Sequence, residues 1–214
     1  LILGNAAFIS GMQVEPDMDQ ERVAVEVSFN NPRGFQTRLR VLMRNPAGEV
    51  SEIYKELKLE KENASHRFIL GIKDWKKEKY TWAHDKPNLF AIEVQLESKT
   101  TKTKGIPEYS FSVMKTFGFR KFDCIKGDFY LNDSIIKLHG INYSQHWSQG
   151  GLWTSQNPNF RKDLESLKKL GFNTIRSGGA PLSNEALDLC DELGLLVFQE
   201  FPVHTMRSSA RGLE

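Results

Sequence analysis

The sequence lacks an excess of charge of either sign. Its 29 Lys and Arg residues stand against 27 Asp and Glu residues, which leaves a net charge of +2 at pH 7. Proteins that bind nucleic acid or an anionic membrane surface by electrostatic attraction carry a marked surplus of Lys and Arg. We therefore predict neither nucleic acid nor a membrane as a partner. Hydrophobic residues make up 39% of the chain and charged residues 26%, which is typical of a globular protein.

Cysteine is also scarce, and its scarcity excludes two kinds of architecture. Cys124 and Cys190 are too few for a disulfide framework, and their spacing matches no zinc-binding pattern. His204 would need further ligands to hold a metal ion, and no Gly-x-Gly-x-x-Gly turn is present for a nucleotide. The sequence predicts no metal and no cofactor. Cys190 lies among leucines, so we expect it to be a small buried side chain.

Long hydrophobic runs are missing as well. No segment approaches the ~20 apolar residues of a membrane-spanning helix. Residues 1–8 lack the basic start and long apolar stretch of a complete signal peptide, so the sequence indicates no compartment. We expect the chain to be a piece of a longer protein.

The first half of the sequence has the pattern of β-strands. Residues 23–29 alternate strictly between apolar and polar types, and the turn-forming segment 30–34 follows at once. About seven such segments occur before residue 119 if residues 7–14 form the first. Short strands separated by turns predict an antiparallel, immunoglobulin-like β-sandwich of ~100 residues. The Cys…Trp…Cys signature of antibody domains is absent.

The pattern changes after about residue 120. Residues 132–134 form a hairpin signal, after which apolar strand segments alternate with two helical ones. The first helix is expected from Pro158 to Gly171, and the second from a cap at Ser183 to Gly194. Strand–helix–strand order with short connections predicts a parallel sheet with crossover helices. A small doubly wound domain is a weaker alternative.

Six segments in matching order resemble glycoside hydrolase family 2, which includes β-galactosidases, β-glucuronidases and β-mannosidases. They are Trp82 with residues 87–90, then 118–120, 129–132, 138–142, 167–176 and 189–197. The resemblance implies a multi-domain chain. Residues 1–119 would be the all-β immunoglobulin-like sandwich, and residues 120–214 an α/β domain, the N-terminal portion of an incomplete (β/α)8 TIM barrel. A full barrel takes ~250 residues.

The implied activity belongs to the parent protein. It is a retaining exo-β-glycosidase acting on terminal β-linked sugars of the galactose, glucuronate or mannose type. Retaining glycosidases need two carboxyl groups ~5 Å apart. In the family, these lie on the fourth and seventh barrel strands, which this chain does not reach. Asp191 and Glu192 are adjacent in a helix and point to different sides. We assign no catalytic residue and expect the fragment to be inactive.

Five residues are candidates for binding substrate or supporting the active site. Asn142, Arg176 and Glu200 end predicted parallel strands, and strand ends form the active-site face of a TIM barrel. The resemblance implies that Arg176 supports the nucleophile carboxylate through its planar donor fork. Glu200 either orients an Arg or a sugar hydroxyl, or forms a structural ion pair. His146 and Trp147 offer a hydrogen bond and an aromatic platform for a sugar, or else pack on the barrel rim.

The sugar and the role of the fragment stay open. Ser177–Pro181 lacks the His that β-galactosidases carry after this Arg, and its double Gly is closer to β-mannosidases, which have Trp where this chain has Ser177. A non-catalytic carbohydrate-binding or protein-binding module is the alternative function. The open strand edges of an incomplete barrel predict either self-association of the isolated chain or a poorly ordered C-terminal region.

Overall fold

In the computed structural model the chain divides into two compact units, which are described separately. Unit 1 comprises residues 1–82 and 88–121, and unit 2 comprises residues 83–87 and 122–214. The structure describes residues 7–30, 36–57, 63–72, 75–99, 109–143, 158–178 and 181–201. The inclusion of residues 83–87 in unit 2 was not predicted from the sequence.

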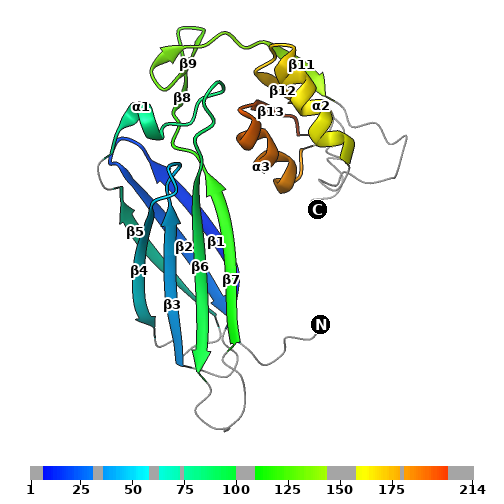
Figure 1. Ribbon diagram of the computed structural model, residues 1–214. Coiled ribbons are helices and arrows are strands. Elements are labelled where there is room, and N and C mark those ends of the chain that lie inside the picture. The colour runs from blue at the N-terminus through cyan, green and yellow to red at the C-terminus, as the bar shows by residue number, and fades with distance from the viewer. Residues whose placement is uncertain are drawn as a thin grey trace, which may run out of the picture. The chain divides into compact units, whose positions relative to one another are not determined.

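Unit 1 consists of two antiparallel sheets (Figure 1). One sheet has the strand order β1-β2-β5 and the other β4-β3-β6-β7. All seven predicted strands are present, and one short helix, α1, precedes β6. Their bounds are β1 (Phe8–Asp17), β2 (Arg22–Asn30), β3 (Gln36–Arg44), β4 (Val50–Leu57), β5 (Asn63–Gly71), α1 (Lys77–Tyr80), β6 (Phe90–Lys99) and β7 (Tyr109–Phe117).

The core of unit 1 follows from alternation along the strands. Every second residue of β2 is buried, as the sequence pattern predicts. Burying a Val or Phe side chain contributes ~1.5–3 kcal/mol, so each strand adds several such increments to the same core. The fully buried residues of β2 and β6 that form the centre of this core are Val23, Val25, Val27, Phe29, Phe90, Ile92, Val94 and Leu96.

A tight corner joins the two ends of unit 1. Trp82 is fully buried, and its backbone N–H donates to the carbonyl of Phe119 at 2.8 Å. A Cβ on Gly118 would lie 2.6 Å from Trp82 Cβ, so only glycine fits there. The guanidinium of Arg120 covers the indole ring at 4.6 Å from its centroid. This contact gives a physical reason for the Trp82 and Gly118–Arg120 segments singled out in the sequence.

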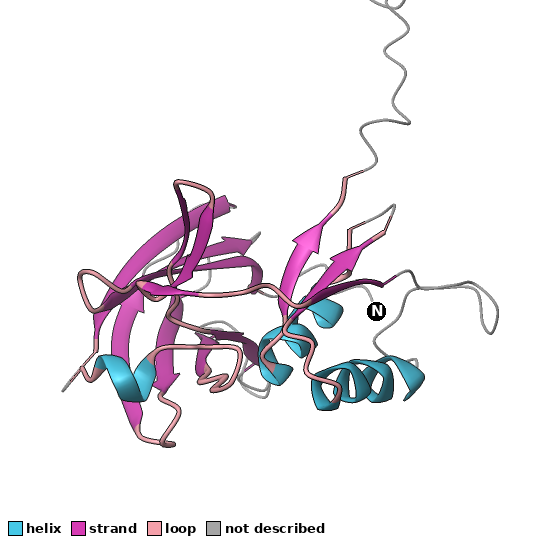
Figure 2. Cartoon of the chain, turned by 90° about the horizontal axis from the view of Figure 1, so that it is seen from above, coloured by secondary structure: helices cyan, strands magenta, loops and turns pink. Residues whose placement is uncertain are grey.

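Unit 2 contains an antiparallel hairpin sheet and a parallel sheet. The hairpin sheet has the order β10-β9-β8, and the parallel sheet the order β11-β12-β13. Two helices, α2 and α3, connect the parallel strands and gather on one face of them (Figure 2). The bounds are β8 (Phe122–Ile125), β9 (Asp128–Leu131), β10 (Ser134–Ile135), β11 (Gly140–Tyr143), α2 (Pro158–Lys169), β12 (Thr174–Ser177), α3 (Asn184–Leu193) and β13 (Leu196–Gln199).

The helix ends of unit 2 confirm the predicted signals. Ser183 Oγ accepts a hydrogen bond from the backbone N–H of Ala186 at 3.3 Å, which caps α3. Gly194 ends that helix with φ +72°, and Gly171 follows α2 with φ +90°. Cys190 is fully buried on α3, as predicted. Within the described ranges, no helix has the length and apolar character needed to cross a membrane.

Candidate active site

The candidate site lies at the carboxyl ends of the three parallel strands. Asn142 on β11 is paired in register with Arg176 on β12, and Arg176 with Phe198 on β13. Side chains alternate between the faces of a sheet, so Asn142 and Arg176 project from the same face. Glu200 follows Phe198 by two residues, immediately past the end of β13 at Gln199.

Three of the predicted residues converge at this edge. Arg176 Nη1 donates to Asn142 Oδ1 at 3.4 Å, and Arg176 Nη2 lies 3.3 Å from Glu200 Oε2. The Arg176 side chain is 53% exposed and Glu200 is 26% exposed, so the guanidinium stays accessible while it is held on two sides. An exposed ion pair contributes little to stability. What the two contacts do is orient the Arg176 guanidinium between Asn142 and Glu200.

A second set of contacts at the same strand ends was not predicted. Ser177 is fully buried, and its Oγ accepts a hydrogen bond from the Glu200 N–H at 2.9 Å and donates to the Phe198 carbonyl at 3.5 Å. Gln199 Oε1 accepts from the Leu182 N–H at 3.2 Å. The only sequence signal for the hydrogen bond between Ser177 and Glu200 is a small polar residue at the end of a buried strand.

Tyr143 points away from the site, to the helix side of the sheet. Its hydroxyl donates to Asp163 Oδ2 at 3.1 Å, and its ring packs edge-on against Phe160 on α2. Burial raises the pKa of Tyr143 well above its usual range, and the negative charge of Asp163 raises it further. The phenol therefore stays protonated and ties β11 to α2.

Glu192 and Cys190, two further reactive groups of unit 2, have structural surroundings. Glu192 forms a bidentate ion pair with Arg161, at 3.0 and 2.8 Å. The hydrogen bond from Arg161 lowers the pKa of Glu192. Burial raises the pKa of the Cys190 thiol to about 12, so it is not a nucleophile at neutral pH. His146 and Trp147 lie outside the described residues. The described part of the chain holds no group of three or more His, Cys, Asp or Glu residues that could bind a metal ion.

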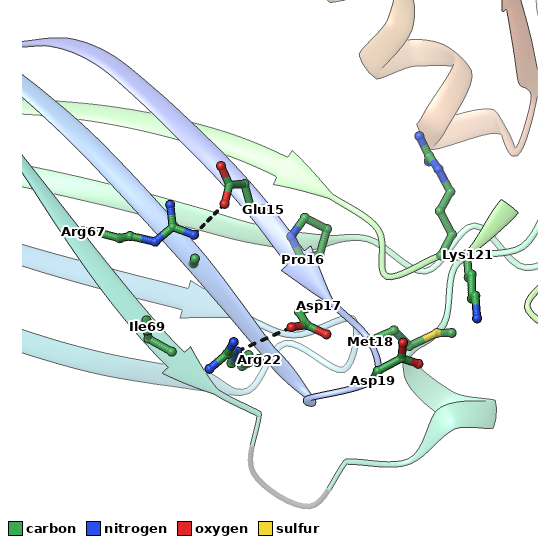
Figure 3. A pocket seen from close by; sticks show the side chains of 11 residues that line it. Glu15, Pro16, Asp17, Met18, Asp19, Arg22, Arg67, Ile69 and Lys121 are labelled. Atoms are coloured by element: carbon green, nitrogen blue, oxygen red, sulfur yellow. Dashed lines mark hydrogen bonds and ion pairs between the residues drawn. The ribbon is translucent and has the colours of Figure 1, made fainter.

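Unit 1 has a surface hollow of about 430 Å³ beside the ends of β1 and β2 (Figure 3). Four of its charged side chains form two ion pairs: Arg67 lies 2.6 Å from Glu15, and Arg22 lies 3.5 Å from Asp17. These ion pairs leave no reactive constellation, and we assign the hollow no catalytic role. It is lined by Glu15, Pro16, Asp17, Met18, Asp19, Arg22, Ala24, Arg67, Ile69, Arg120 and Lys121.

The sequence and fold match a known group of enzymes. Residues 122–212 match the family model described as glycosyl hydrolases family 2, TIM barrel domain. The β-galactosidase of Thermoanaerobacterium thermosulfurigenes is 30% identical over 201 residues, which cover 91% of this chain and 26% of that protein. A putative β-glucuronidase of Formosa agariphila is 29% identical over 188 residues, covering 86% of this chain and 21% of that protein.

Solved structures show the same fold. A β-glucuronidase of Parabacteroides merdae superposes with a TM-score of 0.71 at 24% identity, covering 92% of this chain and 24% of that one. β-Glucuronidase 2 of Bacteroides uniformis, covalently bound to cyclophellitol-6-carboxylate aziridine, gives 0.66 at 26% identity, covering 92% of this chain and 23% of that one. The chain spans about a quarter of the length of these relatives.

Proposed function

The chain belongs to glycoside hydrolase family 2, and on this premise we propose that it is part of a retaining exo-β-glycosidase. The parent enzyme would hydrolyse terminal β-linked sugars of the galactose, glucuronate or mannose type. The observation that carries the proposal is the convergence of Asn142, Arg176 and Glu200 at the ends of three parallel strands. Strand ends of this kind form the active-site face of a TIM barrel.

We propose the domain assignment together with the function. Residues 1–119 would be an immunoglobulin-like sandwich, and residues 120–214 the N-terminal portion of the barrel. The strand orders β1-β2-β5 and β4-β3-β6-β7 support the first part. They differ from the constant-type immunoglobulin order only in the fourth strand, which pairs with the third instead of the fifth. The match of residues 122–212 to the barrel domain supports the second part.

In the proposed mechanism this chain supplies support for the reacting groups. A retaining glycosidase uses one carboxylate as the nucleophile and a second carboxyl group as acid and base, ~5 Å apart. We place both beyond this chain. Arg176 would hold the nucleophile ionised and oriented by donating from its fork, since charge-assisted hydrogen bonds are strong and directional. Asn142 and Glu200 would keep that fork in place.

The relatives support both the retaining chemistry and a sugar as partner. Their names include β-galactosidase and β-glucuronidase. The β-glucuronidase 2 of Bacteroides uniformis is covalently bound to cyclophellitol-6-carboxylate aziridine, and formation of a covalent bond is what a nucleophilic side chain contributes to catalysis. His146 and Trp147 are proposed to contact the sugar through a hydrogen bond and a stacked ring, as the sequence suggested.

The test is turnover of p-nitrophenyl β-glycosides by the complete gene product. We expect hydrolysis of at least one of the galactoside, the glucuronide and the mannoside. Arg176→Lys should lower kcat/KM by ~10²-fold or more, because an ammonium cannot reproduce the bidentate fork. Arg161→Lys is the matched control. It alters an Arg that also holds a carboxylate, but on the helix side of unit 2, and should change kcat/KM by less than about threefold.

Two outcomes would contradict the proposal. The first is binding of sugars by the complete protein without turnover of any β-glycoside, which would favour the carbohydrate-binding module. The second is turnover by residues 1–214 alone that Glu200→Gln abolishes, since it would place a catalytic carboxylate in this chain.

We also propose that residues 1–214, expressed alone, self-associate through the open edges of the β11-β12-β13 sheet. Unpaired strand edges bind other strands, and Phe198 in β13 and Phe201 just after it are 45% and 59% exposed. Light scattering should give a mass above that of one chain. A monomer at all concentrations tested would be evidence against this association.

A further inference from the structure

We propose that Ser177 is a positioning residue that fixes Glu200 against Arg176. The inference rests on the proposed function, because it concerns the support of the same site. Ser177 follows Arg176 directly on β12, and its hydroxyl bonds the chain at Glu200. Nothing in the charge or hydrophobic pattern of the sequence points to this role.

The contact begins where the strand ladder stops. The last paired residues of β12 and β13 are Ser177 and Gln199. Glu200 therefore lies one residue past the β12–β13 ladder. Ser177 Oγ accepts the Glu200 N–H at 2.9 Å, so a side chain continues the ladder by one residue.

Two contacts on opposite sides then fix Glu200. The Ser177 hydroxyl holds its backbone N–H from the buried side, and the Arg176 guanidinium meets its carboxylate on the site side, at 3.3 Å. The guanidinium and the hydroxyl belong to consecutive residues of β12, Arg176 and Ser177. A residue held at its backbone and at its side chain has a fixed orientation, whereas one held by an exposed ion pair alone does not.

Burial makes the Ser177 contact persistent. Ser177 is fully buried, and a buried hydroxyl is costly unless it is hydrogen-bonded. Gln199 holds the end of β13 independently, since its Oε1 accepts from the N–H of buried Leu182. Loss of the Ser177 hydroxyl should therefore remove the acceptor of the Glu200 N–H while leaving the strand in place.

The test compares variants of Ser177 in the complete protein. In Ser177→Ala we expect the amide hydrogen of Glu200 to exchange ~10-fold faster or more, because its acceptor is gone. We expect kcat/KM to fall by ~10- to 100-fold, mainly through kcat, because a small misplacement of supporting groups slows the chemical step. Ser177→Thr, which keeps the hydroxyl, should restore a large part of both losses.

Two further variants separate positioning from packing. Ser177→Cys fills the space of the Ser side chain, but its sulfur is a weak hydrogen-bond acceptor, so this variant should behave like Ser177→Ala. It also keeps the test available if Ser177→Ala does not fold. Thr174→Val is the matched control. It removes a buried hydroxyl from the same strand, but that hydroxyl bonds Asn173 Oδ1 at the opposite strand end. It should leave Glu200 exchange unchanged and kcat/KM within about threefold.

The outcomes distinguish this inference from the proposed function. Unchanged Glu200 exchange in Ser177→Ala or Ser177→Cys overturns the positioning role, and so does an equal loss of activity in Thr174→Val. Absence of turnover on every β-glycoside overturns the proposed function instead. The exchange measurement needs no substrate, so it decides the role of Ser177 in either case.

Discussion

The two units differ in what they bury. In the described part of unit 1 the buried side chains are hydrophobic, whereas the buried polar side chains, Asn173, Thr174 and Ser177, all lie in unit 2, in or beside β12. A sandwich can place all its polar groups on outer faces, because its strands alternate. In unit 2 the side chains of Asn173 and Ser177 instead accept backbone N–H groups at the two ends of β12, and such buried hydrogen bonds hold those ends in place. The described part of unit 1 is therefore held by apolar burial, whereas β12 in unit 2 is also held by buried hydrogen bonds.

The largest effect should come from the apolar core of unit 1. Phe90 is fully buried, with ring centroids of Phe117 and Phe119 at 5.5 and 5.1 Å. Phe90→Ala should lower the free energy of unfolding by ~3–5 kcal/mol, through lost burial and a cavity. Met114→Ala, on a 66% exposed side chain in β7, should cost less than ~0.5 kcal/mol. Hydrogen exchange of the β2 and β6 amides measures unit 1 by itself, and comparable losses in the two variants would contradict the assigned core.

The next largest effect concerns residues 83–87, which belong to unit 2 although the residues before and after them in the sequence belong to unit 1. Lys168 Nζ donates to the carbonyls of His84 and Gly194 at 2.5 and 3.0 Å. A Cβ on Gly194 would collide with the carbonyl oxygen of His84. Gly194→Ala should therefore destabilise unit 2 by ~3 kcal/mol, partly because Ala disfavours positive φ.

Gly171 provides the matched control for that prediction. It also has positive φ, but its Cβ direction is open, so Gly171→Ala should cost only the ~1–2 kcal/mol of the left-handed conformation. The two variants are compared by urea unfolding with exchange of the β12 amides. Equal costs would mean that residues 83–87 do not press on the end of α3.

The third effect tests the buried polar groups directly. Asn173 Oδ1 accepts from the His139 N–H and the Thr174 hydroxyl, both at 2.8 Å, and its Nδ2 donates to the Lys137 carbonyl at 2.9 Å. Asn173→Ala leaves these groups without their partner and should cost ~2 kcal/mol. Asn88→Ala, whose amide bonds two carbonyls of unit 1 from a more exposed position, should cost about half as much. A larger loss for Asn88→Ala would remove the distinction between the units.

Local patterns explain most of what the sequence predicted. Alternation gave the strands of unit 1, and Pro158, Ser183 and Gly194 marked helix ends where they occur. The convergence of Asn142, Arg176 and Glu200 followed from a general rule about parallel strand ends, so it needed no knowledge of side-chain positions. Their role in binding a sugar stays a prediction.

Contacts between distant segments explain what the sequence did not predict. The hydrogen bond of Ser177 depends on the register of β12 against β13, and a short apolar strand carries no register signal. Residues 83–87 belong to unit 2, where His84 accepts a hydrogen bond from Lys168, more than eighty positions along the chain, and no local pattern indicates such a contact. Arg161 lies 3.8 Å from Glu165, which is four residues further along α2. Lys169 satisfies the same helical spacing from Glu165, so spacing alone could not choose between the two partners.

The smallest effect should come from the exposed ion pair between Glu192 and Arg161. The Arg161 hydrogen bond lowers the pKa of Glu192 in the folded state below its unfolded value. A lowered carboxyl pKa adds stability above the unfolded value, near 4.5, and this contribution is lost as the pH falls through the folded pKa. Glu192→Gln should therefore cost ~0.5 kcal/mol at pH 7, the usual scale for an exposed pair, and nothing near pH 3.

The exposure of this ion pair makes its contribution to stability depend on salt, which gives a second test. The Glu192 and Arg161 side chains are 54% and 49% exposed, so added salt should reduce the pH 7 difference, whereas the cost of Asn173→Ala should not change. Urea midpoints of the two variants at low and high salt, at pH 7 and pH 3, give the comparison. A salt-independent difference in Glu192→Gln would show that the pair is shielded from solvent, and unit 2 would then hold a buried charge as well as buried dipoles.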